Sequence, residues 1–279
     1  MRIAVTGAGG MLGQDLCRIL GVRHEVYPFG RADLDVTDPD AVAEALARLA
    51  PQVVVHAAGW TDVDGCERDP DRAFRVNTLG SRYVAAAAAS VGAALCYLST
   101  DYVFDGAKKA PYTEWDPPSP LSVYGGSKLA GEREVRALCP RHWIVRTSWL
   151  YGPGRNFVAA ILAQAARGGP LRVVDDQVGS PTYTEDLAGG LAALLETARF
   201  GVYHLTNAGL CSWFQFATAI LEAAGLRVPI EPIPSSALDR PAPRPPYSVL
   251  RNACWELEGR PPLRPWPEAL RAYLARVHP

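Results

Sequence analysis

The chain has 279 residues, of which 48% are apolar and 20% are charged. This length and composition are typical of a globular protein with about two lobes, and they exclude a disordered, collagen-like or coiled-coil chain. The 28 Lys and Arg residues nearly balance the 29 Asp and Glu residues, giving a net charge of -1. Such a chain lacks the basic surface that binds nucleic acid or a membrane, so we expect neither partner.

In the first half of the chain, short runs rich in Val and Ile alternate with helical patterns. The runs predict strands at residues 3–6, 25–29, 53–57, 94–99 and 143–147. The segments between them predict helices at 11–20, 39–49, 71 to about 91, and 124–138. Alternating strands and helices with buried apolar strands indicate an α/β fold, a doubly wound parallel-sheet Rossmann domain. The ligand crevice of such a fold lies at the carboxyl ends of the strands.

After residue 151 the alternation is less regular. Helices are expected from about Phe157, Glu185, Trp213 and Glu268, with strands near 172–174 and 202–205. We therefore predict a first lobe over 1–151 and a smaller C-terminal α/β lobe over 152–279, with part of 175–207 returning to the first. Residues 228–246 hold seven prolines and form either a flexible linker or an ordered extended wrap; single prolines between apolar residues favour the wrap.

Cysteine usage and the first residues bear on the compartment. The six cysteines include no Cys-x-x-Cys pair, and most lie in apolar runs, so free thiols in a reducing compartment are expected. The chain opens with MRIAVTG and shows no signal-peptide pattern, which predicts a cytoplasmic protein. Residues 83–98 are too short and weakly apolar to span a membrane. The five histidines lack metal-ligand spacing, so no metal site is predicted.

Glycines follow the first predicted strand. The segment Thr6-Gly7-Ala8-Gly9-Gly10-Met11-Leu12-Gly13 places Gly-x-x-Gly-x-x-Gly between a strand and a helix. Glycines let a backbone approach a pyrophosphate, which then accepts hydrogen bonds from the free N–H groups of the helix N-terminus. A tight turn is the alternative interpretation. The position at the first strand–helix junction favours dinucleotide binding by the first lobe, which leaves substrate binding mainly to the second.

The residue after the second strand indicates whether the site binds a 2'-hydroxyl or a 2'-phosphate on the adenosine ribose. The chain reads Tyr27-Pro28-Phe29-Gly30-Arg31, without the carboxylate that accepts from a 2'-hydroxyl. Arg31 is suited to a 2'-phosphate, which favours NADPH, although a solvated loop arginine is the alternative. Asp35 and Val36, and Ala57, Ala58 and Gly59 after the third strand, are expected to contact the adenine and the phosphates.

Polar side chains leave the fourth strand, and a Tyr-x-x-x-Lys pair follows them. Ser99, Thr100 and Asp101 end the strand at the predicted ligand edge. Tyr124 and Lys128 are four residues apart, so a helix places both on one face. The chain has only three lysines, at 108, 109 and 128, which makes such a pair uncommon by chance.

These residues resemble those of the extended short-chain dehydrogenase/reductase superfamily, which shares Tyr-x-x-x-Lys. The segments TGAGGMLG, STDYVFDG, YGGSKLAGE, RTSWLYG and VVDDQVGSPTY resemble the dTDP-4-dehydrorhamnose reductase family within it. The similarity runs from Arg2 to about Asp186, and more loosely through Arg244-Pro245 and Pro265-Trp266.

The resemblance implies reduction of the C4 keto group of dTDP-4-dehydro-L-rhamnose, giving dTDP-L-rhamnose. It assigns catalysis to Thr100, Tyr124 and Lys128, and substrate contacts to Thr100, Asp101 and Trp149. Trp149 as a core aromatic is an equal alternative. Lys128 is expected to lower the pKa of Tyr124 toward neutrality and to bind the nicotinamide ribose.

The resemblance also implies NADPH as cofactor, with NADH tolerated, a nucleotide-sugar substrate and a homodimer; Mg²⁺ enters by resemblance alone. Asn156, Arg172 and Arg244 of the second lobe are available to bind the nucleotide. Two alternatives stay open. One is a dinucleotide-binding regulatory subunit like that of methionine adenosyltransferase, and the other is a nucleotide-sugar epimerase.

Overall fold

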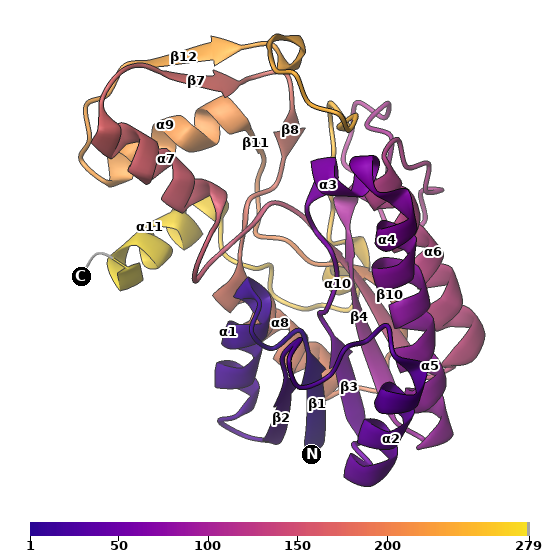
Figure 1. The fold of residues 1–279 in the computed structure, drawn as a ribbon. Helices are drawn as coiled ribbons and strands as arrows, with labels where there is room; N and C mark the ends of the chain where they lie inside the picture. Colours follow the sequence, from indigo (N-terminus) through magenta and orange to yellow (C-terminus); the bar gives the residue numbers. More distant parts are fainter. Residues whose placement is uncertain (278–279) are drawn as a thin grey trace.

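The computed structural model describes residues 1–277 and contains a central six-stranded sheet (Figure 1). The strands are all parallel, in the order β10-β5-β4-β3-β1-β2. Their bounds are β1 Arg2–Thr6, β2 Glu25–Phe29, β3 Val53–His56, β4 Ala94–Thr100, β5 His142–Thr147 and β10 Gly201–His204. The predicted doubly wound Rossmann fold is confirmed, and each of the first five strands lies within one residue of its predicted bounds.

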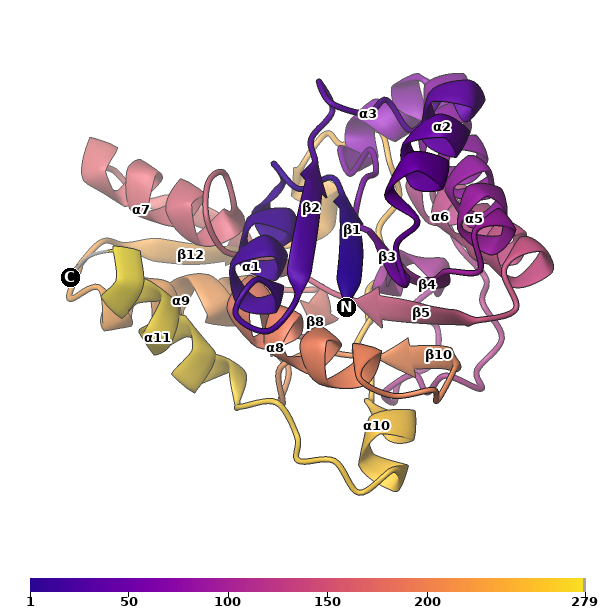
Figure 2. The same cartoon turned by 90° about the horizontal axis from the view of Figure 1, so that it is seen from below.

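Helices cover both faces of this sheet (Figure 2). On one face lie α1 (Met11–Leu20), α8 (Thr184–Leu195) and α10 (Ala253–Leu257), whose apolar side chains share a core with Ile3 and Val5. On the other face lie α2 (Pro39–Leu49), α5 (Gly80–Ser90) and α6 (Val123–Leu138), which pack on Ala4 and Val54. Alternate strand residues therefore supply two separate cores, as expected of a sheet buried on both faces.

The helix predicted over residues 71 to about 91 is divided. It comprises α4 (Pro70–Phe74), a π-helical turn η1 (Arg75–Leu79) and α5. Asp69 caps α4 by accepting from the backbone N–H of Arg72 at 3.0 Å. A further short helix, α3 (Val63–Arg68), was not predicted; Asp62 caps it by accepting from the N–H of Gly65 at 2.9 Å.

The second lobe lies above the carboxyl ends of the sheet strands (Figure 1). Its core joins apolar side chains of α7 (Phe157–Arg167), α9 (Trp213–Ala223) and α11 (Trp266–Val277). Three two-stranded sheets complete it: β6 (Leu150–Tyr151) with β9 (Thr182–Tyr183), β8 (Val178–Gly179) with β11 (Cys211–Ser212), and β7 (Leu171–Val174) with β12 (Ile230–Ile233). Two elements from this part of the chain contact the first lobe: α8 packs on α1, and β10 pairs with β5.

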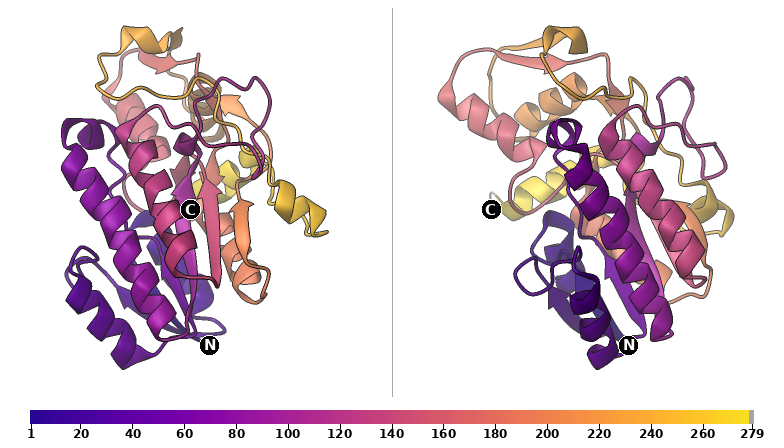
Figure 3. Two further views of the ribbon diagram at one scale, coloured as in Figure 1. Left: turned by 90° about the vertical axis from the view of Figure 1, so that its right-hand side faces the viewer. Right: turned by 45° about the vertical axis from the view of Figure 1, so that its right-hand side comes forward.

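The proline-rich segment is an ordered wrap, as the sequence favoured. It begins with β12, continues through the 3₁₀ turn η3 (Ser235–Ala237) and then passes beside the first lobe (Figure 3). Asp64 fixes it there, because its carboxylate accepts from both terminal guanidinium nitrogens of Arg244, at 3.1 and 2.7 Å. Prolines 245 and 246 pack so closely on Gly106 that a Cβ at that glycine would lie 2.7 Å from Pro246.

The six cysteines are free, and four of them are buried. Within residues 1–277, no helix is both long and apolar enough to cross a membrane. The same described residues contain no group of three or more His, Cys, Asp or Glu side chains that could hold a metal ion.

Candidate active site

The glycine loop lies against the end of β3 and leaves no room for side chains at two positions. Gly7 has a φ of +72°, and a Cβ there would lie 2.6 Å from the backbone nitrogen of Ala58. A Cβ at Gly13 would collide with the carbonyl oxygen of Gly7. Gly10 is the N-cap of α1 and has no side chain to cap it. The N–H groups of the first turn are therefore free to bind an anion.

A cavity of about 590 Å³ opens over this loop and has the size of a cofactor site. Nine predicted cofactor residues line it: Gly7, Gly9, Gly10, Arg31, Asp35, Val36, Ala57, Ala58 and Gly59. Five other predicted cofactor residues do not line it: Met11, Leu12, Gly13, Tyr124 and Lys128. Leu12 is buried in the core beneath α1, and Gly13 packs under Gly7.

Three arginines on the cavity wall make it basic. Arg72 and Arg75 line it together with Arg31, and the Arg72 guanidinium lies 4.3 Å from the ring centroid of Trp60. The two carboxylates of the wall bind their own chain: Asp35 accepts from the N–H and hydroxyl of Thr37, and Asp69 caps α4. These bonds from Thr37 lower the pKa of Asp35. The cavity therefore favours an anionic ligand.

Sequence reasoning missed Trp60, Arg72 and Arg75. The available signal was the spacing of the two arginines, which are three residues apart and share a helix face. The sequence does not show which face of that helix lines the cavity, because this depends on how the helix packs beside the ends of β1 and β3.

Thr100 and Asp101 end β4 at the carboxyl edge of the sheet. Both are buried, and the Thr100 hydroxyl donates to Asp101 Oδ1 at 3.0 Å. Burial raises the pKa of Asp101 to about 7, against the lowering effect of the neighbouring hydroxyls of Ser248 and Thr100. The residue can therefore carry or release a proton near neutral pH.

Tyr124 and Lys128 lie in the first turns of α6, beside these residues. Gly125 permits this approach, because a Cβ there would collide with the carbonyl oxygen of Tyr102. The Thr100 hydroxyl is a neighbour of the Tyr124 phenol. Lys128 lies beside one residue of the cavity wall, since a Cβ at Gly59 would lie 3.8 Å from its Nζ. The structure thus places Thr100 beside Tyr124, and Lys128 on the same helix beside Gly59.

The expected effect of Lys128 on Tyr124 is not found in the protein alone. Burial raises the pKa of the Tyr124 phenol above its ordinary value, with the Thr100 hydroxyl opposing this. The Lys128 ammonium lies over the Tyr97 ring, 4.2 Å from the centroid, and burial lowers its pKa to about 7. The burial of Lys128 thus favours its neutral amine, and no lowering of the Tyr124 pKa by the lysine is seen.

Trp149 lies in the short connection between β5 of the central sheet and β6 of the second lobe. Its ring stacks on Trp213 with centroids 3.5 Å apart, and a Cβ at Gly179 would collide with it. Its backbone has a φ of +46°, in the left-handed region that bulky residues avoid. Such strain persists only where the surroundings enforce it, and it is frequent at functional sites.

Of the three second-lobe residues expected to bind the nucleotide, two have structural partners. Arg244 is held by Asp64, as described above. Asn156 caps α7 by accepting from the N–H of Ala159 at 3.0 Å, and its amide donates to the Tyr273 hydroxyl at 3.0 Å. Arg172 is exposed on β7.

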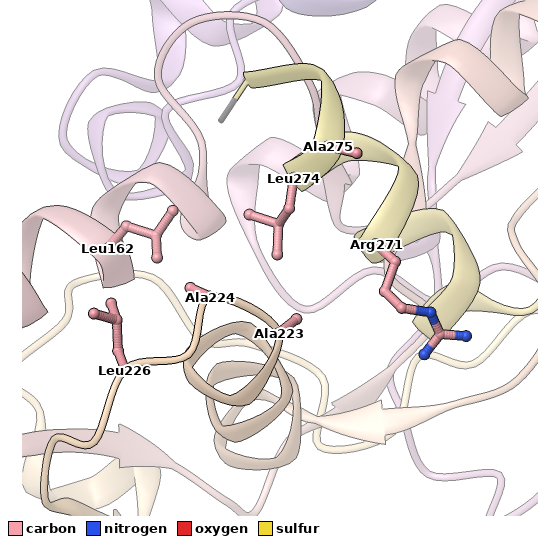
Figure 4. A pocket seen from close by; sticks show the side chains of 7 residues that line it. All are labelled: Leu162, Ala223, Ala224, Leu226, Arg271, Leu274 and Ala275. Carbon is pink, nitrogen blue, oxygen red and sulfur yellow. The ribbon is translucent and has the colours of Figure 1, made fainter. Parts of the chain in front are cut away.

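A second cavity, of about 630 Å³, lies within the second lobe between α7, the end of α9 and α11 (Figure 4). Its lining is apolar except for one charged side chain, that of Arg271. The lining residues are Leu162, Ala223, Ala224, Leu226, Arg271, Leu274 and Ala275. None of the predicted site residues lines it, so the glycine-loop cavity is the candidate site.

Comparison with known proteins identifies close relatives. The family model of the RmlD substrate binding domain matches residues 1–278. The dTDP-4-dehydrorhamnose reductase of Streptomyces griseus is 47% identical over 278 residues, covering 96% of this chain and 91% of that protein. The crystal structure of a dTDP-4-dehydrorhamnose reductase from Clostridium acetobutylicum superposes with a TM-score of 0.98, at 43% identity over 100% of both chains. That of dTDP-4-dehydrorhamnose reductase from Bacillus anthracis in complex with NADP gives a TM-score of 0.97, at 38% identity over 99% of both chains.

Proposed function

The chain belongs to the RmlD substrate binding domain family, and on this premise we propose that it is an NADPH-dependent reductase. It reduces the C4 keto group of dTDP-4-dehydro-L-rhamnose to the hydroxyl of dTDP-L-rhamnose. The observation that carries this proposal is that the Thr100 hydroxyl neighbours the Tyr124 phenol while Lys128, on the same helix, lies beside Gly59 of a basic cavity built over a glycine loop. Relatives of 38–47% identity over nearly the whole chain bear the reductase name.

The residues present fit a dinucleotide. Gly7 and Gly13 leave a cradle that any Cβ would fill, and the first turn of α1 offers free N–H donors to a pyrophosphate. Ala57, Ala58 and Gly59 leave space for the adenosine side, and Arg31 is placed for a 2'-phosphate. When bound, the nicotinamide supplies the hydride that the sugar C4 carbon accepts. The Mg²⁺ suggested by the resemblance has no support from the described residues and is not part of the proposal.

The chain's own residues orient the sugar and move the proton. Thr100 orients the C4 carbonyl oxygen, and Tyr124 donates its phenolic proton to that oxygen as negative charge develops there. Lys128 would hold the nicotinamide ribose of the bound cofactor. From that position its ammonium stabilises the phenolate that Tyr124 becomes. The phenolate then regains a proton from solvent. Asp101 and Trp149 contact the sugar.

The function is tested by following NADPH oxidation with enzymatically prepared dTDP-4-dehydro-L-rhamnose. The dTDP group has a whole second lobe to bind it, and remote binding energy can position the sugar at the reacting carbon. We therefore expect turnover with the dTDP sugar and a loss in both kcat and kcat/KM with the free keto sugar. Equal rates for the two substrates would contradict recognition of the nucleotide.

The alternatives give different results in the same assay. A nucleotide-sugar epimerase would keep its cofactor bound and show no net NADPH consumption. A regulatory subunit would bind the dinucleotide, show no turnover and co-purify with a large partner enzyme. The buried Thr100 and Lys128 and the phenol of Tyr124 have no evident purpose in a purely regulatory protein.

Cofactor preference is expected to depend on Arg31. One charge-assisted contact to a 2'-phosphate contributes about 1.5 to 3 kcal/mol, or roughly a ten- to hundredfold preference for NADPH over NADH in kcat/KM. Arg31→Ala should reduce this ratio without changing kcat/KM for NADH. The matched control is Arg48→Ala, on the exposed side of α2. If the wild-type protein uses both cofactors equally, Arg31 does not have this role.

The proposal also covers the cellular compartment and the oligomeric state of the protein. Six free thiols favour a reducing environment, and we place the reaction in the cytoplasm. A homodimer remains a prediction, which light scattering of the purified protein would test.

A further inference from the structure

A charged side chain lies fully buried one helical turn beyond Lys128. Glu132 is four residues further along α6, so its side chain shares a helix face with that of Lys128. Its exposed fraction is 0%. Oε1 accepts from the Ser99 hydroxyl at 2.6 Å and from Arg146 Nε at 2.9 Å, and Oε2 accepts from Arg146 Nη2 at 2.8 Å. This is the two-point fork that arginine forms with a carboxylate.

The partners of Glu132 come from the two strands next to the reacting groups. Ser99 of β4 and Arg146 of β5 lie directly opposite each other in the sheet, and the next pair is Thr100 with Thr147. Glu132 therefore connects the helix that carries Tyr124 and Lys128 to the strand end that carries Thr100. A small shift of α6 against β4 and β5 would break three hydrogen bonds, one to β4 and two to β5.

Packing alone does not require an ion pair at this place. Replacing a buried ion pair with apolar side chains of similar volume is often neutral or stabilising, whereas removing one partner costs several kcal/mol. The Glu132–Arg146 pair thus holds α6 against β5 without an evident gain in the free energy of folding. A role of this pair in the function of Lys128 explains why an ion pair is present here.

The groups around Lys128 leave Glu132 as the negative charge that acts on it. His56 of β3, which interacts with Lys128, and His204 of β10, which lies beside Arg146, are neutral, since burial lowers the pKa of each to about 3. Tyr97 of β4 and Tyr124 of α6 are uncharged phenols whose pKa values burial raises. Arg146 is occupied by Glu132, and Arg136 lies near the solvent, 3.6 Å from Oε2. Burial lowers the pKa of Lys128 to about 7, and Glu132 opposes that shift.

We propose that Glu132, held by Arg146 and Ser99, is a positioning residue that keeps Lys128 charged and fixes α6 against Thr100. The inference rests on the proposed function, because it concerns the lysine of that site. It assigns a role to the last residue of Tyr-x-x-x-Lys-x-x-x-Glu and to Arg146 of β5.

The test compares the pH profiles of wild-type protein and Glu132→Gln. Glutamine keeps the shape and still accepts from Ser99, but it removes the charge that favours the ammonium. The ammonium is then lost at lower pH, so the decline of kcat with rising pH should move down by about one pH unit. We expect kcat to fall about tenfold at neutral pH with little change in KM for the sugar.

The matched control is Glu134→Gln, which makes the same charge change on the same helix. Glu134 forms a longer and more exposed pair with Arg82, at 3.8 Å, and its variant should keep the wild-type profile. If Glu132→Gln does not fold, Glu132→Gln/Arg146→Met removes both charges and avoids an unpaired guanidinium. This double variant should show a shift in the same direction. A folded variant of either kind with an unshifted profile overturns the inference.

A measurement of NADP⁺ binding distinguishes a failure of this inference from a failure of the proposed function. If the wild-type protein binds NADP⁺ but does not reduce the dTDP sugar, the proposed function fails. The pH dependence of NADP⁺ affinity, measured without sugar, still tests the inference. The affinity of Glu132→Gln should decline at lower pH than that of the wild-type protein, and identical curves would contradict a role for Glu132 in the charge of Lys128.

Discussion

Tyr124→Phe is expected to reduce kcat by a factor on the order of 10² to 10⁴ while leaving the fold and NADP⁺ affinity intact. The change removes one hydroxyl from a half-buried ring beside Thr100 and leaves the packing of α6 on Tyr102 in place. Without the phenolic proton, the developing alkoxide has no positioned acid. The measurement is single-turnover oxidation of NADPH, together with the melting temperature and the Kd for NADP⁺.

The control for this variant is Tyr83→Phe. Tyr83 is partly buried on α5 and packs on the core away from the cavity, so loss of its hydroxyl should leave kcat unchanged. A Tyr124→Phe protein with near-normal kcat would show that another group protonates the sugar.

Lys128→Met is expected to weaken both cofactor binding and turnover. The loss of a charge-assisted contact to the ribose should raise the Kd for NADP⁺ about ten- to hundredfold, and kcat should fall as well because the phenolate loses its cation. Calorimetry gives the Kd, and the pre-steady-state rate gives the chemical step. Lys109→Met, at an exposed lysine, is the control that should change neither.

Stability gives a second readout for Lys128→Met. The folded protein holds the lysine pKa at about 7, below its ordinary value, so burial penalises the ammonium. This penalty grows as the pH falls from about 10.5 toward 7 and is present in full below that. Methionine keeps the apolar stem without the charge, so the variant should be as stable as the wild-type protein or more so near neutral pH. A large loss of stability would indicate a structural lysine.

The sheet of the first lobe could be predicted because its signals are local. Runs such as Val53–Val55 are apolar throughout and lie in short strands bounded by loop residues, and Gly7 to Gly13 mark the junction between strand and helix. The π-helical turn could not be predicted. It places buried Asn77 so that its side chain bonds both the N–H and the carbonyl of Trp60, a contact across 17 residues with no local signal.

The arginines of the cavity wall and the partner of Arg244 could not be predicted either, because both depend on contacts between distant parts of the chain. Arg72 and Arg75 gain their role only because α4 and η1 lie over the ends of β1 and β3. Arg244 was expected to reach the nucleotide, but it pairs with Asp64, 180 residues earlier in the chain. Local sequence shows that an arginine is available for binding; it does not show which carboxylate the fold brings to it.

The expected acidity of Tyr124 depended on a distance that spacing does not give. Residues four apart on a helix share a face, yet Lys128 extends over Tyr97 and toward Gly59. Sequence spacing therefore located the pair, while the electrostatics of the phenol depend on burial and on which ring the ammonium faces.

The central claim is that this chain transfers hydride from NADPH to the C4 carbon of dTDP-4-dehydro-L-rhamnose. The most direct measurement uses NADPH carrying deuterium at the nicotinamide C4 position, with isolation of the nucleotide-sugar product for NMR and mass spectrometry. We expect dTDP-L-rhamnose with deuterium bound to the sugar C4 carbon, and we expect Tyr124→Phe to lose nearly all of this product. A product without deuterium at C4, or no product from the dTDP sugar, would contradict the claim.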